Sequence, residues 1–253
     1  MERLIVADPH LGQRPGDVAA MAGLLEAVRR GGVREVIYLG DVCQYLIGMP
    51  KFWTTQVREL LALWDDLRAE GIRVGIVEGN RDFFLGEPEL EAHLDWWGRS
   101  HEFESGGTRY RLVHGDLVNR KDRMYRFWSA LAKSRPAHFW ARLLPDGLAV
   151  GIVRQMEARL AKTNRRFRYR KPVDDLVREA RQAWNTGVDV LLWGHFHTPW
   201  RCDEDGHTAL VVPAWLEFGL TVLVDGKGWR LVENTLTPPE RLPRMERCPR
   251  KSI

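Results

Sequence analysis

Side chains that can bind metals follow five short apolar runs in this 253-residue sequence. The runs are four to six residues long, and glycine stands beside the metal-binding residues after four of them. In chain order the motifs are Asp8-Pro9-His10, Gly40-Asp41, Gly79-Asn80-Arg81-Asp82, His114-Gly115-Asp116 and Gly194-His195-Phe196-His197. Imidazole, carboxylate and amide donors without a thiolate favour Mn, Fe or Zn in a reactive site over a structural zinc site. Two such ions about 4 Å apart can clamp the attacking and leaving oxygens of a phosphoryl group.

A single Asp or His after a strand is usually a turn residue or a helix cap. Five strand ends in one chain, carrying four His, four Asp and one Asn, are hard to explain by turn chemistry alone. Active sites of α/β proteins gather outside the carboxyl ends of strands, and glycine there allows tight turns and a close approach of ligands. We therefore expect the five motifs to form one two-metal site.

The segments around the motifs predict the elements that position them. Strands are predicted at Leu4–Ala7, Glu35–Leu39, Ile72–Val77, Arg109–Val113 and Val188–Trp193, and helical periodicity fills several of the intervals between them. Three more strands near 208–212, 220–224 and 229–232 are expected to be antiparallel, because Asp-Gly turns precede or separate them. This order of elements predicts an α/β fold with two sheets.

The charge of the chain is concentrated in one segment. Residues 119–171 contain fifteen Lys or Arg and three acidic residues, although the whole chain has a net charge of only +4. We predict that this segment is a basic helical cap inserted into a catalytic domain of residues 1–118 and 172–236, followed by a Pro- and Arg-rich tail at 237–253. A basic cap suits an anionic partner such as a membrane surface, nucleic acid or a phosphorylated substrate.

Three scattered cysteines without a CxxC pair argue against both a disulfide framework and a zinc ribbon. No apolar run approaches the roughly 20 residues of a membrane span, and the first strand leaves no room for a signal peptide. A cytoplasmic protein is therefore expected.

These motifs, in this order, resemble the calcineurin-like metallophosphoesterases. The resemblance implies an α/β/β/α sandwich in which Asp8, His10 and His197 hold one metal. It also implies that Asn80, His114 and His195 hold the other metal, with Asp41 bridging the two. Most members carry His where this chain has Arg81, a permanent cation suited to gripping phosphate. We expect Arg81 and Asp82 to be catalytic, with Asp82 orienting Arg81.

A narrower resemblance is to the UDP-2,3-diacylglucosamine hydrolases of lipid A synthesis. It is carried by residues 80–86, 37–41 and 45–48, and by the position and length of the insertion. It implies two Mn²⁺ ions and hydrolysis of the pyrophosphate to UMP and the acylated sugar 1-phosphate by a metal-bound hydroxide. The substrate contacts that it implies are Asn80, Arg81, Asp122, Tyr125, Asn164, Arg168 and His195. This chain departs from the family at Met49-Pro50, where an acidic pair is usual, and at 165–168.

The cap has the pattern expected of a lipid-binding lid. Met124, Trp128 and Leu131 share one helical face, and Phe139 and Leu143 share another. Apolar inner faces could hold acyl chains while arginines meet anionic head groups. An acylated UDP-sugar and the surface of the inner membrane are the expected partners, with peripheral association.

Three alternatives remain open at this stage. The cap could be an ordinary amphipathic helical pair that packs its apolar side on the domain. The enzyme could be a nuclease or a hydrolase of soluble nucleotides, since the basic cap also carries Phe167 and Tyr169, although nucleic acid is not the expected partner. A non-catalytic metal scaffold is disfavoured, because every ligand position of the family pattern is filled.

Overall fold

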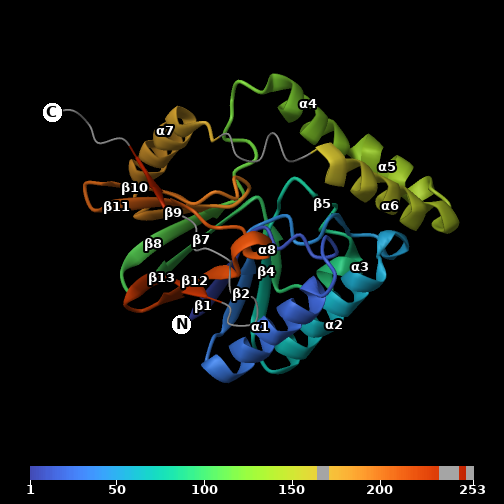
Figure 1. Cartoon of the computed structure of the whole chain (residues 1–253), viewed down its shortest axis with the longest axis horizontal. Coiled ribbons are helices and arrows are strands. Elements are labelled where there is room, and N and C mark those ends of the chain that lie inside the picture. The colour runs from blue at the N-terminus through green and yellow to red at the C-terminus, as the bar shows by residue number, and fades with distance from the viewer. Residues whose placement is uncertain (164–170, 234–244, 249–253) are drawn as a thin grey trace.

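The computed structural model describes residues 1–163, 171–233 and 245–248 (Figure 1). Two six-stranded sheets form its centre, in the orders β13-β12-β1-β2-β4-β6 and β14-β10-β11-β9-β8-β7. The strands of the first sheet are β1 (Arg3–Val6), β2 (Glu35–Tyr38), β4 (Arg73–Val77), β6 (Trp96–Gly98), β12 (Leu220–Asp225) and β13 (Gly228–Glu233). Those of the second are β7 (Ser100–Ser105), β8 (Thr108–Val113), β9 (Val190–Trp193), β10 (Trp200–Glu204), β11 (His207–Val211) and β14 (Glu246–Arg247).

Helices cover both outer faces of the pair of sheets. Helices α1 (Asp17–Gly31) and α2 (Thr55–Ala69) pack on the first sheet, and α7 (Val173–Trp184) packs on the second (Figure 1). The predicted α/β/β/α sandwich is therefore confirmed. Two short helices, α3 (Pro88–Glu91) and α8 (Trp215–Phe218), lie in connections between strands.

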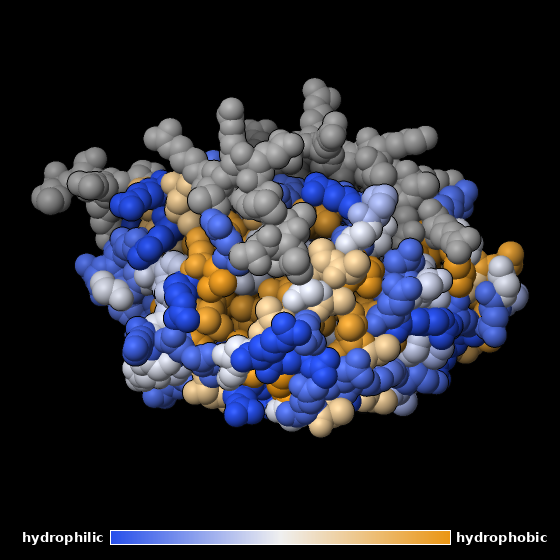
Figure 2. Space-filling model, turned by 60° about the horizontal axis from the view of Figure 1, so that its bottom comes forward, coloured by the Kyte–Doolittle hydropathy of each residue, from blue (hydrophilic) through white to orange (hydrophobic). Residues whose placement is uncertain are grey.

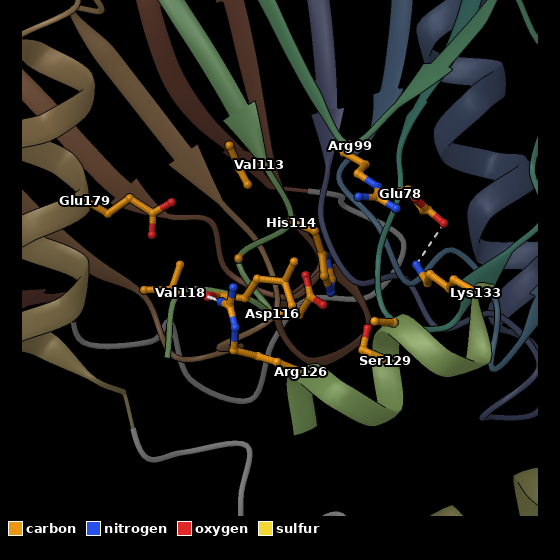
Figure 3. Close-up of a pocket in the computed structure, with 13 residues that line it drawn as sticks. Glu78, Arg99, Val113, His114, Asp116, Val118, Arg126, Ser129, Lys133 and Glu179 are labelled. Carbon is orange, nitrogen blue, oxygen red and sulfur yellow. Dashed lines mark hydrogen bonds and ion pairs between the residues drawn. The ribbon is translucent and has the colours of Figure 1, made fainter. Parts of the chain in front are cut away.

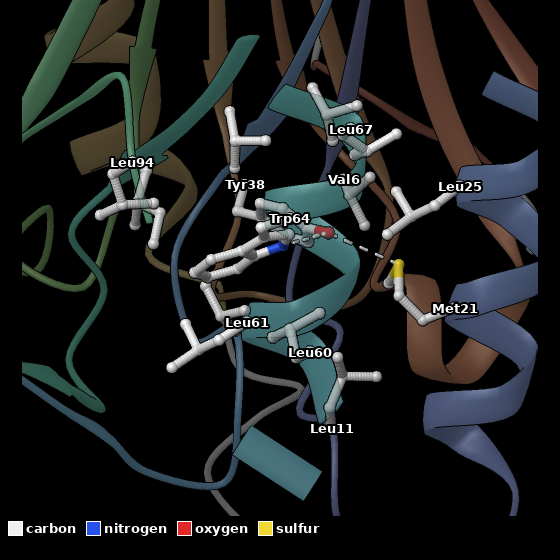
Figure 4. Packing of buried hydrophobic residues seen from close by; sticks show 14 of the residues in the cluster. Val6, Leu11, Met21, Leu25, Tyr38, Leu60, Leu61, Trp64, Leu67 and Leu94 are labelled. Atoms are coloured by element: carbon white, nitrogen blue, oxygen red, sulfur yellow. Dashed lines mark hydrogen bonds between the residues drawn. The ribbon is translucent and has the colours of Figure 1, made fainter. Parts of the chain in front are cut away.

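After a charged first residue, the central strands β1, β2 and β4 carry no further charged side chain, because both of their faces are buried. Leu4 and Val6 of β1 face the helices, whereas Ile5 packs between the sheets. In the helix-facing cluster, Trp64 donates a hydrogen bond to the Tyr38 hydroxyl, which contacts Met21 (Figure 4). Burial on both sides explains why these strands read as continuous apolar runs and not as alternating patterns. The rigid core fixes the carboxyl ends of the strands, where the predicted motifs lie.

The basic insertion forms three helices, α4 (Arg123–Ala132), α5 (Arg135–Leu143) and α6 (Asp146–Thr163). The base of this cap packs on η1 (Pro50–Phe52) and on a small parallel sheet of β3 (Leu46–Ile47) and β5 (Asp82–Phe83). Ala149 and Val153 of α6 are buried there against Met49 and Phe52. The Met49-Pro50 step, which replaces the usual acidic pair, thus supports the cap.

The antiparallel pairing predicted for the strand near 208–212 is present on one of its two sides. The strand expected near 208–212 (β11) pairs antiparallel with β10, which the sequence analysis did not identify, but it pairs parallel with β9. The loop after β9 and strand β10 place β11 back beside β9 in the same direction. The expected antiparallel pair of β12 with β13 is present, and β12 also pairs antiparallel with β1.

The surface is mixed in polarity. Figure 2 shows hydrophobic residues gathered across the middle of one face with hydrophilic residues around them, which is usual because apolar atoms contribute more than half of a folded protein's surface. Across the described ranges, no helix combines the length and the apolar character needed to span a bilayer.

Candidate metal centre

The five motifs meet at one edge of the sandwich. Strands β1, β2 and β4 run parallel in the first sheet, and β8 and β9 run parallel in the second. Hydrogen bonds join the two edges: the His195 amide donates to Asp8 Oδ2 at 2.8 Å, and the Gly194 amide donates to the His114 carbonyl at 3.0 Å. The side chains that the sequence predicted to share a site are therefore brought together.

Five of the seven predicted metal ligands have a left-handed backbone. The φ angles of Asp8, His10, Asp41, His195 and His197 lie between 43° and 64°. A non-glycine residue in this region costs free energy, and such residues cluster where the surrounding structure imposes a functional geometry.

Asp8, His10 and His197 form one group of potential ligand atoms, all buried. The Nε2 atoms of the two histidines lie 3.4 Å apart, and the rings stack with their centroids 5.2 Å apart. Two nitrogens bound to one ion at about 2.1 Å are separated by a similar distance. Asp8 Oδ1 is fully buried and accepts no hydrogen bond from the described residues, so a cation would satisfy it.

Asp8, Asp41 and His114 form a second group. Asp41 faces both groups, because its Oδ2 lies 3.8 Å from His10 Nε2 and its Oδ1 lies 3.5 Å from His114 Nε2. Asn80 Oδ1 lies 3.2 Å from His114 Nε2, and the His195 ring lies 5.2 Å from the His114 ring. Asp41 thus occupies the position of a bridging ligand between two sets of donors.

Glycines beside the ligands leave room for them. A Cβ on Gly40 would lie 2.2 Å from His114 Nδ1, and one on Gly194 would lie 2.8 Å from Asp8 Oδ2. Gly40 also has a φ of 78°, which L side chains rarely adopt. Glycine is therefore needed at both positions to leave space for the ligand side chains, and at Gly40 it is also needed for the backbone conformation.

Hydrogen bonds fix the orientation of His114. Its Nδ1–H donates to the Leu39 carbonyl at 2.9 Å, which directs Nε2 at the site. When Nε2 carries no proton, Nε2 and Asn80 Oδ1 both present lone pairs to the space between them, so a cation placed there satisfies both.

His197 has an orienting partner that the sequence analysis missed. Its Nδ1 lies 2.9 Å from Glu217 Oε1, and Glu217 is held on α8 by the hydrogen bond from the Trp215 amide to the Ala7 carbonyl. A carboxylate on the far nitrogen of a ligating histidine fixes its tautomer and raises its basicity. No signal in the sequence linked α8 to the Gly194-His195-Phe196-His197 motif.

We expect Glu217→Gln to weaken metal binding by about 10- to 100-fold, because outer carboxylates of this kind contribute that much. Titration of the metal-free protein with Mn²⁺ measures the affinity directly. Glu233→Gln, an exposed change at the end of β13, should leave it unaltered. Equal affinities of the Glu217→Gln variant and the unmodified protein would exclude this role.

The buried charges of the site shift one another's pKa values. Burial opposes ionisation of Asp41, but His114, His10 and Arg81 outweigh it and hold the Asp41 pKa below its usual range. Burial lowers the pKa of His114, but Asp41 and Asp8 raise it to about 9. Burial and the neighbouring His114 lower the pKa of His195 to about 4. The negative charge of Asp41 and Asp8 stabilises the extra proton on His114, and the same charge would stabilise a bound metal ion. Metal binding must displace that proton.

Arg81 lies beside the central carboxylate. Its side chain is buried, its Nε is 3.4 Å from Asp41 Oδ2, and its amide donates to Asp41 Oδ1 at 2.9 Å. Its Nη1 donates to Gln44 Oε1 at 2.5 Å, so Gln44 is a second partner that the sequence analysis missed. The guanidinium is thus fixed at the edge of the candidate metal centre.

Asp82 does not orient Arg81 as we predicted. Its carboxylate instead accepts hydrogen bonds from the amides of Asp41 at 2.9 Å, Gly79 at 2.8 Å and Val42 at 3.3 Å. Burial and Asp41 raise its pKa to about 6. These three amides come from the loops after β2 and β4, so Asp82 holds the two loops together. The Arg81 side chain is directed towards Gln44 instead.

The cap residues predicted to contact the substrate differ in their distance from the metal-binding motifs and in their partners. Tyr125 donates its hydroxyl to Asp116 Oδ2 at 3.0 Å, which ties α4 to the motif after β8. Asp122 is exposed and caps α4 by accepting the Tyr125 amide at 2.9 Å. Asn164 and Arg168 lie outside the described residues.

Comparison with known proteins gives a consistent result. Residues 1–218 match the calcineurin-like phosphoesterase superfamily domain. A UDP-2,3-diacylglucosamine hydrolase from Neisseria meningitidis is 26% identical over 233 residues, covering 88% of this chain and 94% of that protein. One from Stenotrophomonas maltophilia is 27% identical, covering 91% and 98%. Among solved structures, a dimetal phosphatase from Danio rerio aligns with 93% of this chain and 99% of its own at a TM-score of 0.44 and 14% identity.

Proposed function

Since this chain belongs to the calcineurin-like phosphoesterase superfamily, we propose that it hydrolyses the pyrophosphate of UDP-2,3-diacylglucosamine to UMP and 2,3-diacylglucosamine 1-phosphate. The family and the hydrolases that it resembles make the chain a metal-dependent phosphoester hydrolase. The proposal concerns its substrate, its metals and its ligands.

Asp8, His10 and His197 would hold one ion and Asn80, His114 and His195 the other, with Asp41 between them. The orphaned oxygen of Asp8 and the facing nitrogens of His10 and His197 support this assignment. Oxygen and imidazole donors suit Mn²⁺, which we propose as the metal. When bound, the two ions supply an activated water and stabilise charge on the phosphoryl oxygens. Arg81 would hold the phosphoryl group from the side of Asp41.

Exposed apolar side chains on the cap are the observation that favours an acylated substrate. Seven large apolar residues of α4 and α5 are 44–67% exposed. They are Met124, Phe127, Trp128, Leu131, Phe139, Trp140 and Leu143, and we call them the exposed apolar residues of the cap. A group of this size on one small subdomain marks a binding surface. The alternative in which the cap packs its apolar side on the domain does not account for them.

This surface lies next to the candidate metal centre. Helix α4 carries Met124, Phe127, Trp128 and Leu131, and the same helix contacts the motif after β8 through Tyr125 and Asp116. Lys133, at its end, pairs with Glu78 at 2.9 Å and donates to the Gly79 carbonyl at 2.5 Å. A substrate with its pyrophosphate at the metals can therefore lay its acyl chains on the cap, where each buried CH₂ contributes about 0.8 kcal/mol. We place the enzyme at the cytoplasmic face of the inner membrane, where such a substrate resides.

Changing Trp128 to Gln tests the substrate. We expect KM for the diacylated nucleotide sugar to rise about tenfold relative to KM for bis(p-nitrophenyl) phosphate, because a lost apolar contact of this size is worth about 1–3 kcal/mol. Trp97→Gln provides a matched control, since Trp97 is also exposed but lies on β6, outside the cap. Release of UMP from the acylated substrate with Mn²⁺ is the assay. Turnover of single-stranded nucleic acid with no turnover of the acylated substrate would identify a nuclease.

A further inference from the structure

A cavity of about 220 Å³, lined by both charged and apolar side chains, opens beside the candidate metal centre (Figure 3). His114 and Asp116 form the wall nearest the metals, and Glu179 of α7 faces them from the other side. Its volume lies below the roughly 300 Å³ at which pockets for drug-sized ligands begin. The cavity therefore fits a compact fragment and is too small for two acyl chains.

Helix α4 separates this cavity from the exposed apolar residues of the cap. Arg126, Ser129, Ala130 and Lys133 line the cavity, and this spacing of three, four and seven residues places them on one helical face. The apolar residues 124, 127, 128 and 131 follow the same spacing on almost the opposite side of the helix. One helix thus presents an apolar surface and a polar wall, both attached to the metal-site loops.

The cavity mixes carboxylates with cations. Glu78, Asp116 and Glu179 line it together with Arg99, Arg126 and Lys133. Lys133 is paired with Glu78, and one oxygen of Asp116 accepts the Tyr125 hydroxyl. Three carboxylates disfavour a site for phosphate alone, and three cations disfavour a site for a metal or an amine. The balance suits a neutral fragment with both donors and acceptors.

Glu179 is the cavity residue best placed to bind a ligand. Its side chain points into the cavity in Figure 3, and its carboxylate makes no hydrogen bond or ion pair with the residues that the structure covers. Burial raises its pKa above the usual value, although the charges of Arg120, Arg178 and Arg126 oppose this shift. A partly buried acceptor without a donor is stabilised when a ligand hydroxyl reaches it.

We propose that this cavity seats the nucleoside half of the substrate, with Glu179 accepting hydrogen bonds from the ribose hydroxyls and Arg99 and Arg126 facing the carbonyl oxygens of the base. This inference rests on the proposed function, and it assigns the two halves of an amphiphilic nucleotide sugar to the two sides of α4. Carboxylates commonly bind ribose hydroxyls, and guanidinium groups donate to carbonyl oxygens and stack on planar rings. The phosphates then lie between the two halves, at the metals.

Binding of UMP to the Mn²⁺-loaded protein tests the assignment, with phenyl phosphate as the reference for the phosphate group alone. Titration calorimetry should give a Kd for UMP at least tenfold below that for phenyl phosphate. Glu179→Ala and Ala130→Trp should each raise the Kd of UMP about tenfold and reduce that difference, because the first removes the acceptor and the second fills the cavity from an exposed position of α4. Glu89→Ala, an exposed change on α3, is the matched control and should retain the difference.

Two results would overturn the assignment: equal affinities of the unmodified protein for UMP and phenyl phosphate, or an unchanged difference between them in both cavity variants. Turnover of UDP-2,3-diacylglucosamine by the unmodified protein, measured in parallel, separates this inference from the proposed function. Turnover with no effect of the cavity variants on UMP rejects the cavity alone. UMP binding that depends on Glu179, without turnover, supports a nucleoside site and rejects the substrate.

Discussion

Replacement of Asp41 by Asn is expected to remove at least one metal ion and to lower phosphodiester hydrolysis by at least about a thousandfold. The carboxylate places one oxygen towards His10 and the other towards His114, at 3.8 and 3.5 Å. A neutral amide has only one oxygen and no charge, so it cannot bridge two cations. Metal ions contribute several kcal/mol to stabilising a phosphoryl transition state, and about 4 kcal/mol corresponds to this loss.

Asparagine is the substitution of choice because it tolerates the left-handed backbone that Asp41 adopts at a φ of 51°. Metal content is measured by atomic emission on protein purified with Mn²⁺, and activity is measured with bis(p-nitrophenyl) phosphate. Asp205→Asn is a matched control, since Asp205 also has a φ of 50° but lies in the turn between β10 and β11. A variant that keeps both metals and full activity would remove Asp41 from the centre.

The motifs of the site could be predicted because each one directly follows a strand in the sequence. The carboxyl ends of parallel strands share an edge, so order along the chain was enough to place Asp8, Asp41 and His114 together. Glu217 and Gln44 could not be predicted in this way, because each contacts its partner across a loop with no motif. The left-handed backbone of five ligands was also hidden, since none of them is glycine.

The cap shows a second limit of sequence patterns. Periodicity identified the shared face of Met124, Trp128 and Leu131. An apolar face on a helix does not by itself indicate which surface it contacts. In the structure these side chains are exposed, and it is the opposite side of α4, with Tyr125 and Lys133, that contacts the strand ends. The order of strands in the second sheet was hidden for a different reason, because Arg201, Asp203 and Glu204 interrupt the apolar pattern of β10.

Arg81→Ala is expected to lower kcat by about a hundredfold while leaving metal content unchanged. The Arg81 guanidinium is buried beside Asp41 and is held there by Gln44. A fixed cation stabilises charge that develops on the phosphoryl oxygens, and one such contact is worth about 10²–10³ in rate. None of the donor atoms in the two candidate ligand groups belongs to Arg81, so both ions should stay bound.

Arg81→Lys separates charge from shape. Lysine keeps a cation but loses the planar fork that reaches Gln44 and Asp41 together, so we expect it to recover only part of the lost rate. Gln44→Ala should reduce kcat less than Arg81→Ala, because it releases the guanidinium without removing it. In the double variant the two losses should not add, since Gln44 acts only through Arg81. Additive losses would show that Gln44 has a role of its own, and loss of metal in Arg81→Ala would show that the guanidinium serves to hold Asp41 in place and does not act on the substrate.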